Sequence, residues 1–486
     1  MGLLDFIFGT NKNEDINVKK QEIQRVKQIG KYAVLNHESE ENIEYDIPCN
    51  IKNVLISKNG KYIVSSAEGQ RPSFNESWDE EEYYDDGPHK FAALRVWEYG
   101  TFKILREFVN IDVKGIDFSN DSQILAISYQ NKDECGGNYC SKENYIEIID
   151  TNTFKTVKSI ILDESEYCIG IALNSDSKYI AARICKQINY RTEGHYIKIF
   201  DIKSCKEVSK INLDEVKYYY KSSIMKFSYD DKFLIFTLDE DLSGVSSPLS
   251  IVDMSKCKEQ YRIDSVSHKS IDIGNISNKL ICYIYENNRG SYYILQMDSD
   301  ILNKIPNYKS DSKIAKFNLD DSKCFVTGYY IGDSALNNRL TSEKIYDAIS
   351  MFDSNSLKNI KTINLSKITG YKVDGINYID VTRYNELLVF CNNYKGNNYL
   401  ACMYSIDLST IYVKQIPSSI RLIGSSSTSY CREKEVILFN RYYCGSHDHA
   451  FIFSTYEEAL NNLADIDREY FNDGKYEHLN SWIRNL

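Results

Sequence analysis

The stretch Cys168–Leu213 decides the fold and reads CIGIALNSDSKYIAARICKQINYRTEGHYIKIFDIKSCKEVSKINL. It contains four short apolar runs, at Ile169–Leu173, Tyr179–Ile184, Tyr196–Phe200 and Glu207–Ile211. Each run has the length of a strand and is rich in β-branched and aromatic residues. The breaks between the runs carry Asn, Asp, Ser or Gly. The pattern predicts a four-stranded antiparallel meander.

The same unit recurs along the chain. Its first strand and the following turn return as GIDFSNDSQILAIS from Gly115, IMKFSYDDKFLIFT from Ile224 and IAKFNLDDSKCFVT from Ile314. An aspartate closes the third strand of successive units, at Asp150, Asp201, Asp253, Asp353 and Asp407. Self-similarity at about 50 residues, with four strands per unit, is typical of a β-propeller. One meander cannot bury both of its faces, so such units stack around an axis as blades.

The ends of the third strands resemble the Trp-Asp endings of WD40 repeats. Val96-Trp97-Glu98, Phe200-Asp201 and Phe352-Asp353 occupy that position, although no copy carries the full Gly-His and Trp-Asp signature. The resemblance extends over residues 30–456, nearly the whole chain. It implies an all-β fold, a single closed β-propeller of four-stranded blades.

Eight blades are the first prediction, because eight segments can serve as first strands. These segments begin near Ile51, Val113, Ile169, Ile224, Ile271, Ile314, Val373 and Ile420. Seven blades are the alternative, since Tyr32–Asn36 is also strand-like and has no place in this count. The last blade lacks an outer strand, and Asn42–Ile47 is predicted to supply it. Joining the two chain ends in this way removes an exposed sheet edge.

Short helices are expected at both ends of the propeller. Residues 1–29 are predicted to form an apolar tip followed by a helix, which begins at residue 13 and has one apolar stripe. The propeller itself is predicted over residues 30–456. A helical extension is predicted over residues 457–486, introduced by the capping pattern of Thr455 and Glu458.

Composition excludes several classes of protein. The chain has 486 residues, 42% of them hydrophobic, and a formal net charge of −11. Length alone suggests about three domains, and the repeat favours one large domain instead. The acidic balance argues against a general nucleic-acid binder, which needs a basic footprint. No apolar run approaches the length of about 18 residues that a transmembrane helix needs, so no transmembrane segment is expected.

The cysteines and the start of the chain bear on where the protein works. Several of the thirteen cysteines fall inside predicted strands, including Cys168, Cys282 and Cys391. Such scattered, buried thiols favour a reduced, cytoplasmic protein. The apolar run near the start is short and has no basic residue before it, so no secretory signal is predicted. An abundance of Lys, Asn, Ile and Tyr, with only 6 prolines, suggests a bacterial source.

The loop Gly69–Lys90 is the most unusual segment of the chain. Within it, residues 76–86 read ESWDEEEYYDD, with seven acidic residues and no basic one. One interpretation is a solvated loop, because acidic runs are usually solvated. The other is a recognition loop for a basic partner, with aromatic anchors among the charges. The candidate partner-binding residues are Trp78, Glu80, Glu81, Glu82, Tyr83 and Tyr84.

Long loops are predicted to gather on one face of the propeller. Every loop from a second to a third strand emerges on the same face of an up-and-down blade. These loops are Gly69–Lys90, Gln130–Asn144, Lys186–His195, Asp239–Pro248, Gly332–Tyr346 and Tyr442–His449. The opposite face is predicted to carry tight turns. Since binding residues concentrate on loops, the long-loop face is the predicted binding face.

Two loops carry residues that could bind zinc. Cys135 and Cys140 lie in one loop, and Cys444, His447 and His449 lie in another. Thiolate and imidazole are zinc ligands, but neither loop holds a complete set of four, and the two blades are far apart around the ring. The interpretation is that these are ordinary loop residues, and neither a metal nor any other cofactor is expected.

No catalytic motif is present. The chain has no Gly-x-Ser-x-Gly elbow, no P-loop and no dinucleotide-binding turn. The predicted function is therefore a non-catalytic scaffold that binds a protein or peptide on the long-loop face. The alternative is a propeller enzyme of hydrolase or lactonase type, or a small-ligand binder, that uses the central channel. Polar residues on first strands would line that channel: Lys114, Asp117, Lys226, Asp272, Lys316, Asp374 and Arg421.

Overall fold

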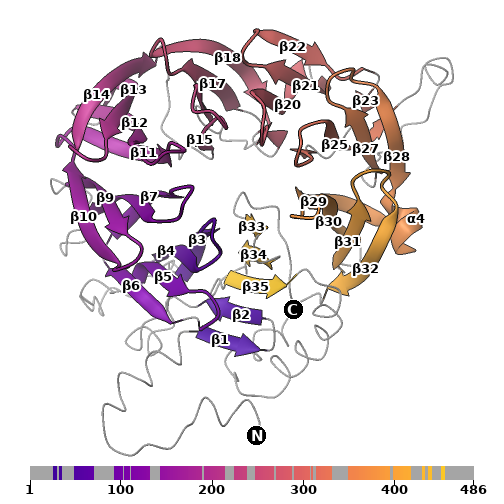
Figure 1. Ribbon diagram of the computed structural model, residues 1–486, viewed down its shortest axis with the longest axis horizontal. Helices are drawn as coiled ribbons and strands as arrows, with labels where there is room; N and C mark the ends of the chain where they lie inside the picture. The colour runs from indigo at the N-terminus through magenta and orange to yellow at the C-terminus, as the bar shows by residue number, and fades with distance from the viewer. Residues whose placement is uncertain are drawn as a thin grey trace, which may run out of the picture.

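The structure is a computed structural model of the chain. It describes residues 26–29, 32–35, 49–69, 92–101, 103–109, 111–131, 143–188, 191–213, 224–237, 247–267, 270–286, 289–306, 308–309, 314–330, 348–393, 398–416, 429–432, 436–440 and 450–454. Almost all of these residues lie in strands or in the turns between them. The described chain is arranged as a ring of small antiparallel meanders around a central axis, and the first strand of each four-stranded meander lies toward the centre (Figure 1).

We call the four-stranded meanders blades and number them in chain order. Each of the first three blades is a separate sheet whose strands pair in sequence order. Blade 1 contains β3 (Cys49–Ile56), β4 (Tyr62–Gly69), β5 (Ala92–Glu98) and β6 (Ile104–Val109). Blade 2 contains β7 (Ile111–Phe118), β8 (Ile124–Asn131), β9 (Asn144–Asp150) and β10 (Lys155–Ile161). Blade 3 contains β11 (Glu166–Leu173), β12 (Tyr179–Ile188), β13 (Arg191–Asp201) and β14 (Lys206–Leu213).

Blades 4 and 5 share one sheet, because Val266 at the end of blade 4 pairs with Ile284 in blade 5. Blade 4 contains β15 (Met225–Phe227), β16 (Phe233–Thr237), β17 (Ser247–Asp253) and β18 (Lys258–Val266). Blade 5 contains β19 (Asp272–Ile273), β20 (Lys279–Glu286), β21 (Arg289–Gln296) and β22 (Ile301–Lys304). A small pair, β23 (Tyr308–Lys309) with β26 (Tyr329–Tyr330), lies beside the next blade.

Blades 6 and 7 again pair their strands in order. Blade 6 contains β24 (Ala315–Phe317), β25 (Lys323–Thr327), β27 (Ala348–Asp353) and β28 (Asn359–Asn364). The short helix α4 (Leu365–Thr369) leads into blade 7, with Asn364 as its N-cap and Gly370 in the left-handed conformation at its end. Blade 7 contains β29 (Val373–Val381), β30 (Glu386–Asn393), β31 (Asn398–Tyr404) and β32 (Thr410–Ile416).

The two ends of the described chain meet in one sheet, which we call blade 8. Its strands are β33 (Ser429–Cys431), β34 (Val436–Asn440), β35 (Ala450–Ser454), β2 (Tyr32–Leu35) and β1 (Val26–Ile29). The pairing of β2 with β35 joins the N-terminal and C-terminal parts of the chain.

Two predictions about the N-terminal part change as a result. The strand that pairs with β35 is β2, whereas the sequence predicted Asn42–Ile47, which lies outside the described residues. The predicted helix over residues 13–29 is wrong at its C-terminal end, because Val26–Ile29 is strand β1. Pairing with β2 supplies hydrogen bonds to these residues, so sheet formation overrides the helical periodicity.

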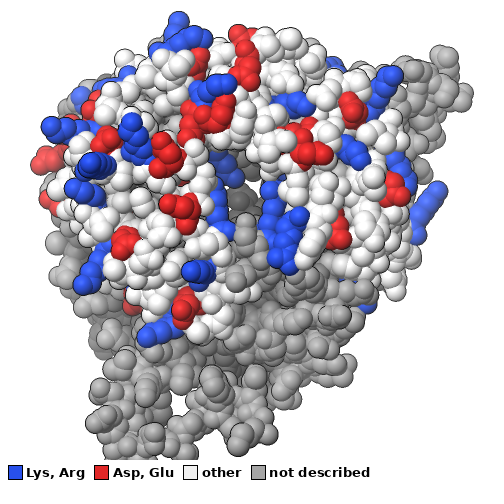
Figure 2. Space-filling model, in the orientation of Figure 1, with Lys and Arg blue, Asp and Glu red and all other residues white. Residues whose placement is uncertain are grey.

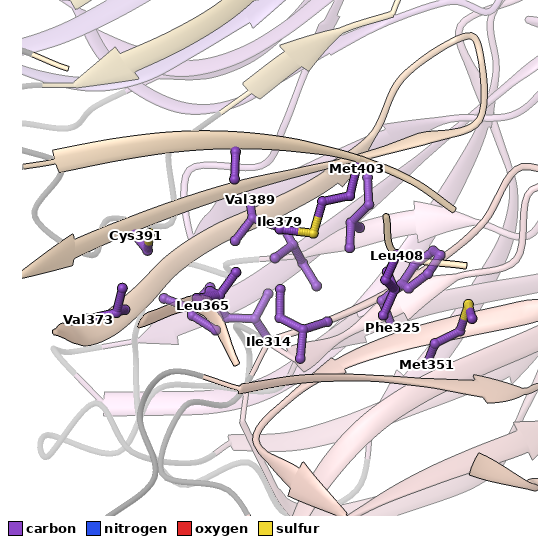
Figure 3. Close-up of a cluster of buried hydrophobic side chains, with 14 of the residues drawn as sticks. Ile314, Phe325, Met351, Leu365, Val373, Ile379, Val389, Cys391, Met403 and Leu408 are labelled. Carbon is purple, nitrogen blue, oxygen red and sulfur yellow. The ribbon is translucent and has the colours of Figure 1, made fainter. Parts of the chain in front are cut away.

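The core lies between the blades. Figure 3 shows one of these layers, in which Phe325 and Met351 of blade 6 pack with Ile379, Val389 and Met403 of blade 7. All five side chains are fully buried. A buried side chain of this size stabilises the fold by roughly 1.5–3 kcal/mol relative to an exposed one. Blade stacking is therefore the main source of stability, as the repeat predicted.

The aspartates that recur after the third strands are turn caps. Asp201 Oδ1 accepts hydrogen bonds from the backbone N–H and the hydroxyl of Ser204, both at 2.7 Å. Asp353 bonds Ser356 in the same way, at 2.7 and 2.9 Å. Hydrogen bonds to the charged form lower the pKa of both carboxyl groups. These residues therefore have a structural role that accounts for their recurrence.

The turns between first and second strands link neighbouring blades. Asp321 Oδ1 and Oδ2 accept hydrogen bonds from the backbone N–H groups of Asn275 and Ile276 in the preceding blade, at 2.8 and 2.9 Å. Asp231 accepts from the N–H of Ser175 at 2.9 Å across the boundary between blades 3 and 4. The linking residue has a positive φ each time, +55° at Asp321 and +60° at Asp231. Asp and Asn tolerate this conformation, which explains the polar turns in the sequence.

Candidate functional site

The connections between strands divide the molecule into two faces. On the face that we call the tight-turn face, first-to-second and third-to-fourth strand connections have four or five residues, such as 228–232 and 202–205. The opposite face, the long-connection face, holds the second-to-third strand connections and the links between blades. Its connections include 70–91, 238–246 and 417–428. The strand boundaries therefore show the predicted difference in connection length between the two faces.

Most of the loop residues singled out in the sequence lie outside the described residues. These are the predicted partner-binding residues Trp78, Glu80, Glu81, Glu82, Tyr83 and Tyr84, and the metal candidates Cys135, Cys140, Cys444, His447 and His449. Among the described residues, no group of three or more His, Cys, Asp or Glu side chains could hold a metal ion. The structure shows eight cysteines as free thiols: Cys168, Cys185, Cys205, Cys257, Cys282, Cys324, Cys391 and Cys402.

One predicted long loop is wrong. Most of Lys186–His195 belongs to strands, because β12 and β13 pair as far as Ile188 with Arg191. Only residues 189–190 separate the two strands. The segment is polar, but it continues a well-formed ladder, so the hydrogen bonds of the hairpin outweigh its composition. His195 is accordingly a buried strand residue, with 3% of its surface exposed, instead of a loop residue.

The described residues place a group of charged side chains at the centre of the ring. The position before the last residue of each first strand is equivalent from blade to blade, as the register with the second strand shows: Asp117 faces Ala126, Lys226 faces Ile235 and Lys316 faces Phe325. In blade order, the residues at this position are Leu55, Asp117, Ala172, Lys226, Asp272, Lys316, Asp380 and Tyr430. Figure 2 shows a central hollow with Lys and Arg side chains on its walls. We call this hollow the central channel.

Charged side chains from blades 5–8 form a network of ion pairs on one side of the channel. Lys316 Nζ lies 3.1 Å from Asp272 Oδ1 and 3.7 Å from Asp380 Oδ2, so it bridges blades 5 and 7. Arg432 follows β33 in blade 8, and its guanidinium lies 3.7 Å from Asp380 Oδ1. Arg432 also donates to the carbonyl oxygen of Val381 at 3.0 Å and to Asn275 Oδ1 at 3.1 Å. Cations and carboxylates from blades 5–8 thus compensate one another.

Two channel carboxylates also bond the backbone of the next blade. Asp117 Oδ2 accepts from the N–H of Leu173 at 2.7 Å, which links blade 2 to blade 3. Asp272 Oδ2 accepts from the N–H of Phe317 at 2.8 Å, which links blade 5 to blade 6. A carboxylate at the same register position therefore links neighbouring blades in two places. A buried backbone N–H without a partner would be costly, and these carboxylates satisfy it.

The channel shifts the pKa values of its charged groups. Burial raises the pKa of Asp117 to about 6, although the hydrogen bond from Leu173 and the charges of Lys58 and Lys226 oppose the shift. Burial, together with the charge of Lys316, lowers the pKa of Lys226. For Asp380, burial opposes ionisation, but the charges of Lys316 and Arg432 outweigh it and lower the pKa.

The sequence identified part of this group. Asp117, Lys226, Asp272 and Lys316 were predicted to line the channel, and the structure brings the other three within electrostatic range of Lys226. Lys114 lies further back on β7 and pairs with Asp112, while Asp374 lies at the opposite end of β29 from Asp380. Arg421 lies outside the described residues. Asp380 and Arg432 were missed; counting back from the turn after each first strand would have found Asp380.

The ring of antiparallel meanders, with first strands around a central channel, defines a β-propeller. No family model matches the sequence, and no curated protein matches it. Among solved structures, one described as the crystal structure of the eukaryotic initiation factor aligns with a TM-score of 0.50 and 12% identity, covering 80% of this chain and 85% of that one. The Dos1 propeller aligns with a TM-score of 0.49 and 11% identity, covering 84% and 93%.

An oligogalacturonate lyase in complex with manganese aligns with a TM-score of 0.46 and 11% identity, covering 89% of this chain and 96% of that one. At these identities the likeness shows the fold alone, and the chain is an all-β propeller repeat protein. Propellers serve as binding proteins and as enzymes, so function has to be argued from the site. No helix in the described part of the chain is long and apolar enough to cross a lipid bilayer.

Proposed function

We propose that this propeller is a non-catalytic scaffold that binds a protein or peptide partner on its long-connection face. The observation that carries the proposal is the difference between the faces: the tight-turn face has no described connection longer than five residues, whereas residues 70–91 join β4 to β5 on the other face. Variable, long connections on a rigid ring are where binding residues collect.

The tight-turn face is built for rigidity, which supports this division of labour. The turn residues there are engaged with one another across blade boundaries: Asn59 N–H donates to Ser122 Oγ at 3.0 Å, and Leu319 N–H donates to Asn385 Oδ1 at 3.1 Å. A ring fixed in this way holds the connections on its other face in constant relative positions. Binding then needs less ordering of the scaffold itself.

The acidic segment between β4 and β5 of blade 1 indicates which kind of partner would bind. Residues 76–86 combine seven acidic residues with Trp78, Tyr83 and Tyr84. Acidic residues attract a basic partner and accelerate association, and aromatic residues supply most of the contact energy in protein interfaces. The proposed partner is therefore a basic protein segment, held by Trp78, Tyr83 and Tyr84 and oriented by Glu80, Glu81 and Glu82.

Affinity capture from native lysate, followed by binding measurements with the purified partner, tests the proposal. The triple substitution Trp78→Ala, Tyr83→Ala and Tyr84→Ala should reduce affinity at least about tenfold, since each anchor contributes more than about 1 kcal/mol. Replacing Glu80, Glu81 and Glu82 by Gln should slow association and weaken its dependence on salt. The control is Tyr229→Ala, on the tight-turn face and 48% exposed. Equal affinity of wild type and triple variant, or loss only in the control, would refute the proposal.

A further inference from the structure

Lys226 differs from the other charged residues at this register position, because no residue in the described part of the chain pairs with it. It occupies the same register position as Lys316, whose ammonium group lies against two carboxylates. Lys226 makes no hydrogen bond or ion pair with any residue that the structure describes, and its side chain is exposed to the channel. An ammonium group in a protein cavity normally has a carboxylate or several oxygen atoms beside it.

The carboxylates closest to Lys226 around the ring are already occupied. Asp117 is bonded to the N–H of Leu173, at 2.7 Å. Asp272 is bonded to the N–H of Phe317 at 2.8 Å and to Lys316 at 3.1 Å. Both lie within electrostatic range of Lys226 without contacting it. Internal ion pairing thus fills one side of the channel and leaves the ammonium group of Lys226 available on the other.

Figure 2 shows the hollow at the centre of the ring, with Lys and Arg side chains at its walls. Lys58, in the turn after β3, is also exposed and lies within electrostatic range of Lys226. Arg432 of blade 8 donates to Asn275 of blade 5, so the charged side chains of blades 5–8 are engaged with one another.

We propose that the central channel binds a small molecule through a single carboxylate group, which pairs with the ammonium group of Lys226. The channel is less polarisable than bulk water, so this ion pair is stronger than one on the surface. Asp117 and Asp272 flank the position, and their repulsion favours a singly charged carboxylate over a phosphate dianion. The inference concerns a different part of the molecule from the proposed protein-binding face and does not depend on it.

Protection of Lys226 from chemical labelling tests the proposal directly on the wild-type protein. The protein is treated with a small neutral amine-acylating reagent, with or without propionate, and labelling at each lysine is quantified by peptide mass spectrometry. At propionate ten times above its Kd, labelling of Lys226 should slow about tenfold, because about one site in ten remains free. Lys158, exposed on the outer strand β10, serves as the internal control and should not change.

Two further samples test whether the site selects a carboxylate over other anions. Sodium chloride at the same ionic strength should give no protection, and phosphate should protect less than propionate. Equal protection by chloride, stronger protection by phosphate, or no protection by propionate would each overturn the proposal. In a separate thermal unfolding series, propionate should raise the Tm of wild type and of Lys158→Gln, but not that of Lys226→Gln. Loss of the shift in both variants would also overturn it.

Discussion

Arg432 donates a hydrogen bond to Asn275 Oδ1 at 3.1 Å, although Arg432 belongs to blade 8 and Asn275 to blade 5. The guanidinium of Arg432 also lies 3.7 Å from Asp380 Oδ1 of blade 7, one of the two blades between blades 5 and 8 in chain order. Residues from blades 5, 7 and 8 are therefore held together at the centre of the ring. Such a contact stabilises the ring in a way that packing between neighbouring blades cannot.

Replacing Arg432 by Gln should show the size of this effect. The substitution removes one of the two cations beside Asp380 and leaves the charge of Lys316, so the pKa of Asp380 should rise. The free energy of unfolding should fall by about 1–3 kcal/mol, because a half-buried, hydrogen-bonded charge is lost. Urea denaturation at pH 7 measures the change. Lys256→Gln, which removes an ion pair in which the lysine is exposed, is the control and should leave the unfolding free energy nearly unchanged.

Asp321 provides a second test, directed at the links between blades. Asp321→Ala removes the acceptor for the backbone N–H groups of Asn275 and Ile276 and places alanine at a φ of +55°. The unfolding free energy should fall by about 2–4 kcal/mol, since both effects are unfavourable. Asp321→Asn keeps one acceptor oxygen and tolerates the backbone conformation, so it should lose less than half as much. Equal losses in urea denaturation would contradict the linking role.

Asp117 makes stability depend on pH in the direction opposite to that of an ordinary ion pair. Its pKa is raised to about 6 by burial, above its value in the unfolded chain, so the folded state takes up a proton. The associated stabilisation is present at low pH and is lost as the pH rises through about 6. Between pH 5 and 7.5 the loss is about 1 kcal/mol.

Asp117→Asn isolates this contribution, because asparagine can still accept the hydrogen bond from Leu173. Relative to wild type, the variant should gain about 1 kcal/mol of unfolding free energy on going from pH 5 to pH 7.5. Urea denaturation of both proteins at the two pH values gives this difference directly. A constant difference would mean that Asp117 does not change its protonation state in this interval.

The strands and turns were predictable because each local signal agreed with the repeat. Short β-branched runs end in polar turns, and those turns are the segments that link the blades, as the Ser119 to Ser122 turn of blade 2 illustrates. Trp97, which resembles the WD40 signature, is fully buried and donates to Ser65 Oγ at 2.7 Å. The signature therefore marks core packing, and the all-β propeller prediction is confirmed.

The channel was only partly predictable, for reasons of register. The first strand of blade 7 has register shifts between Val373 and Gly375 and again between Ile376 and Tyr378. Counting from the start of this strand therefore points to Asp374, while the residue at the equivalent position is Asp380. Arg432 lies in a turn that lacks the Ser and Asn pattern of the other blades. The repeat therefore does not predict that this residue lies in the channel. The strand β2 was left unplaced because its partner β35 is more than 400 residues away in sequence, from Tyr32 to Phe453.

His195 gives a last prediction, at the position that the sequence assigned to a loop. Burial, with a smaller effect from the charge of Arg183, lowers its pKa to about 4. Because this value lies below that of the unfolded chain, the stabilisation is complete above about pH 6.5 and is lost as the pH falls toward 4. From pH 7 to pH 5 the loss is about 1–2 kcal/mol. His195→Gln should lack this part of the pH dependence in urea denaturation, whereas a loop histidine would leave the pH dependence unchanged when it is replaced.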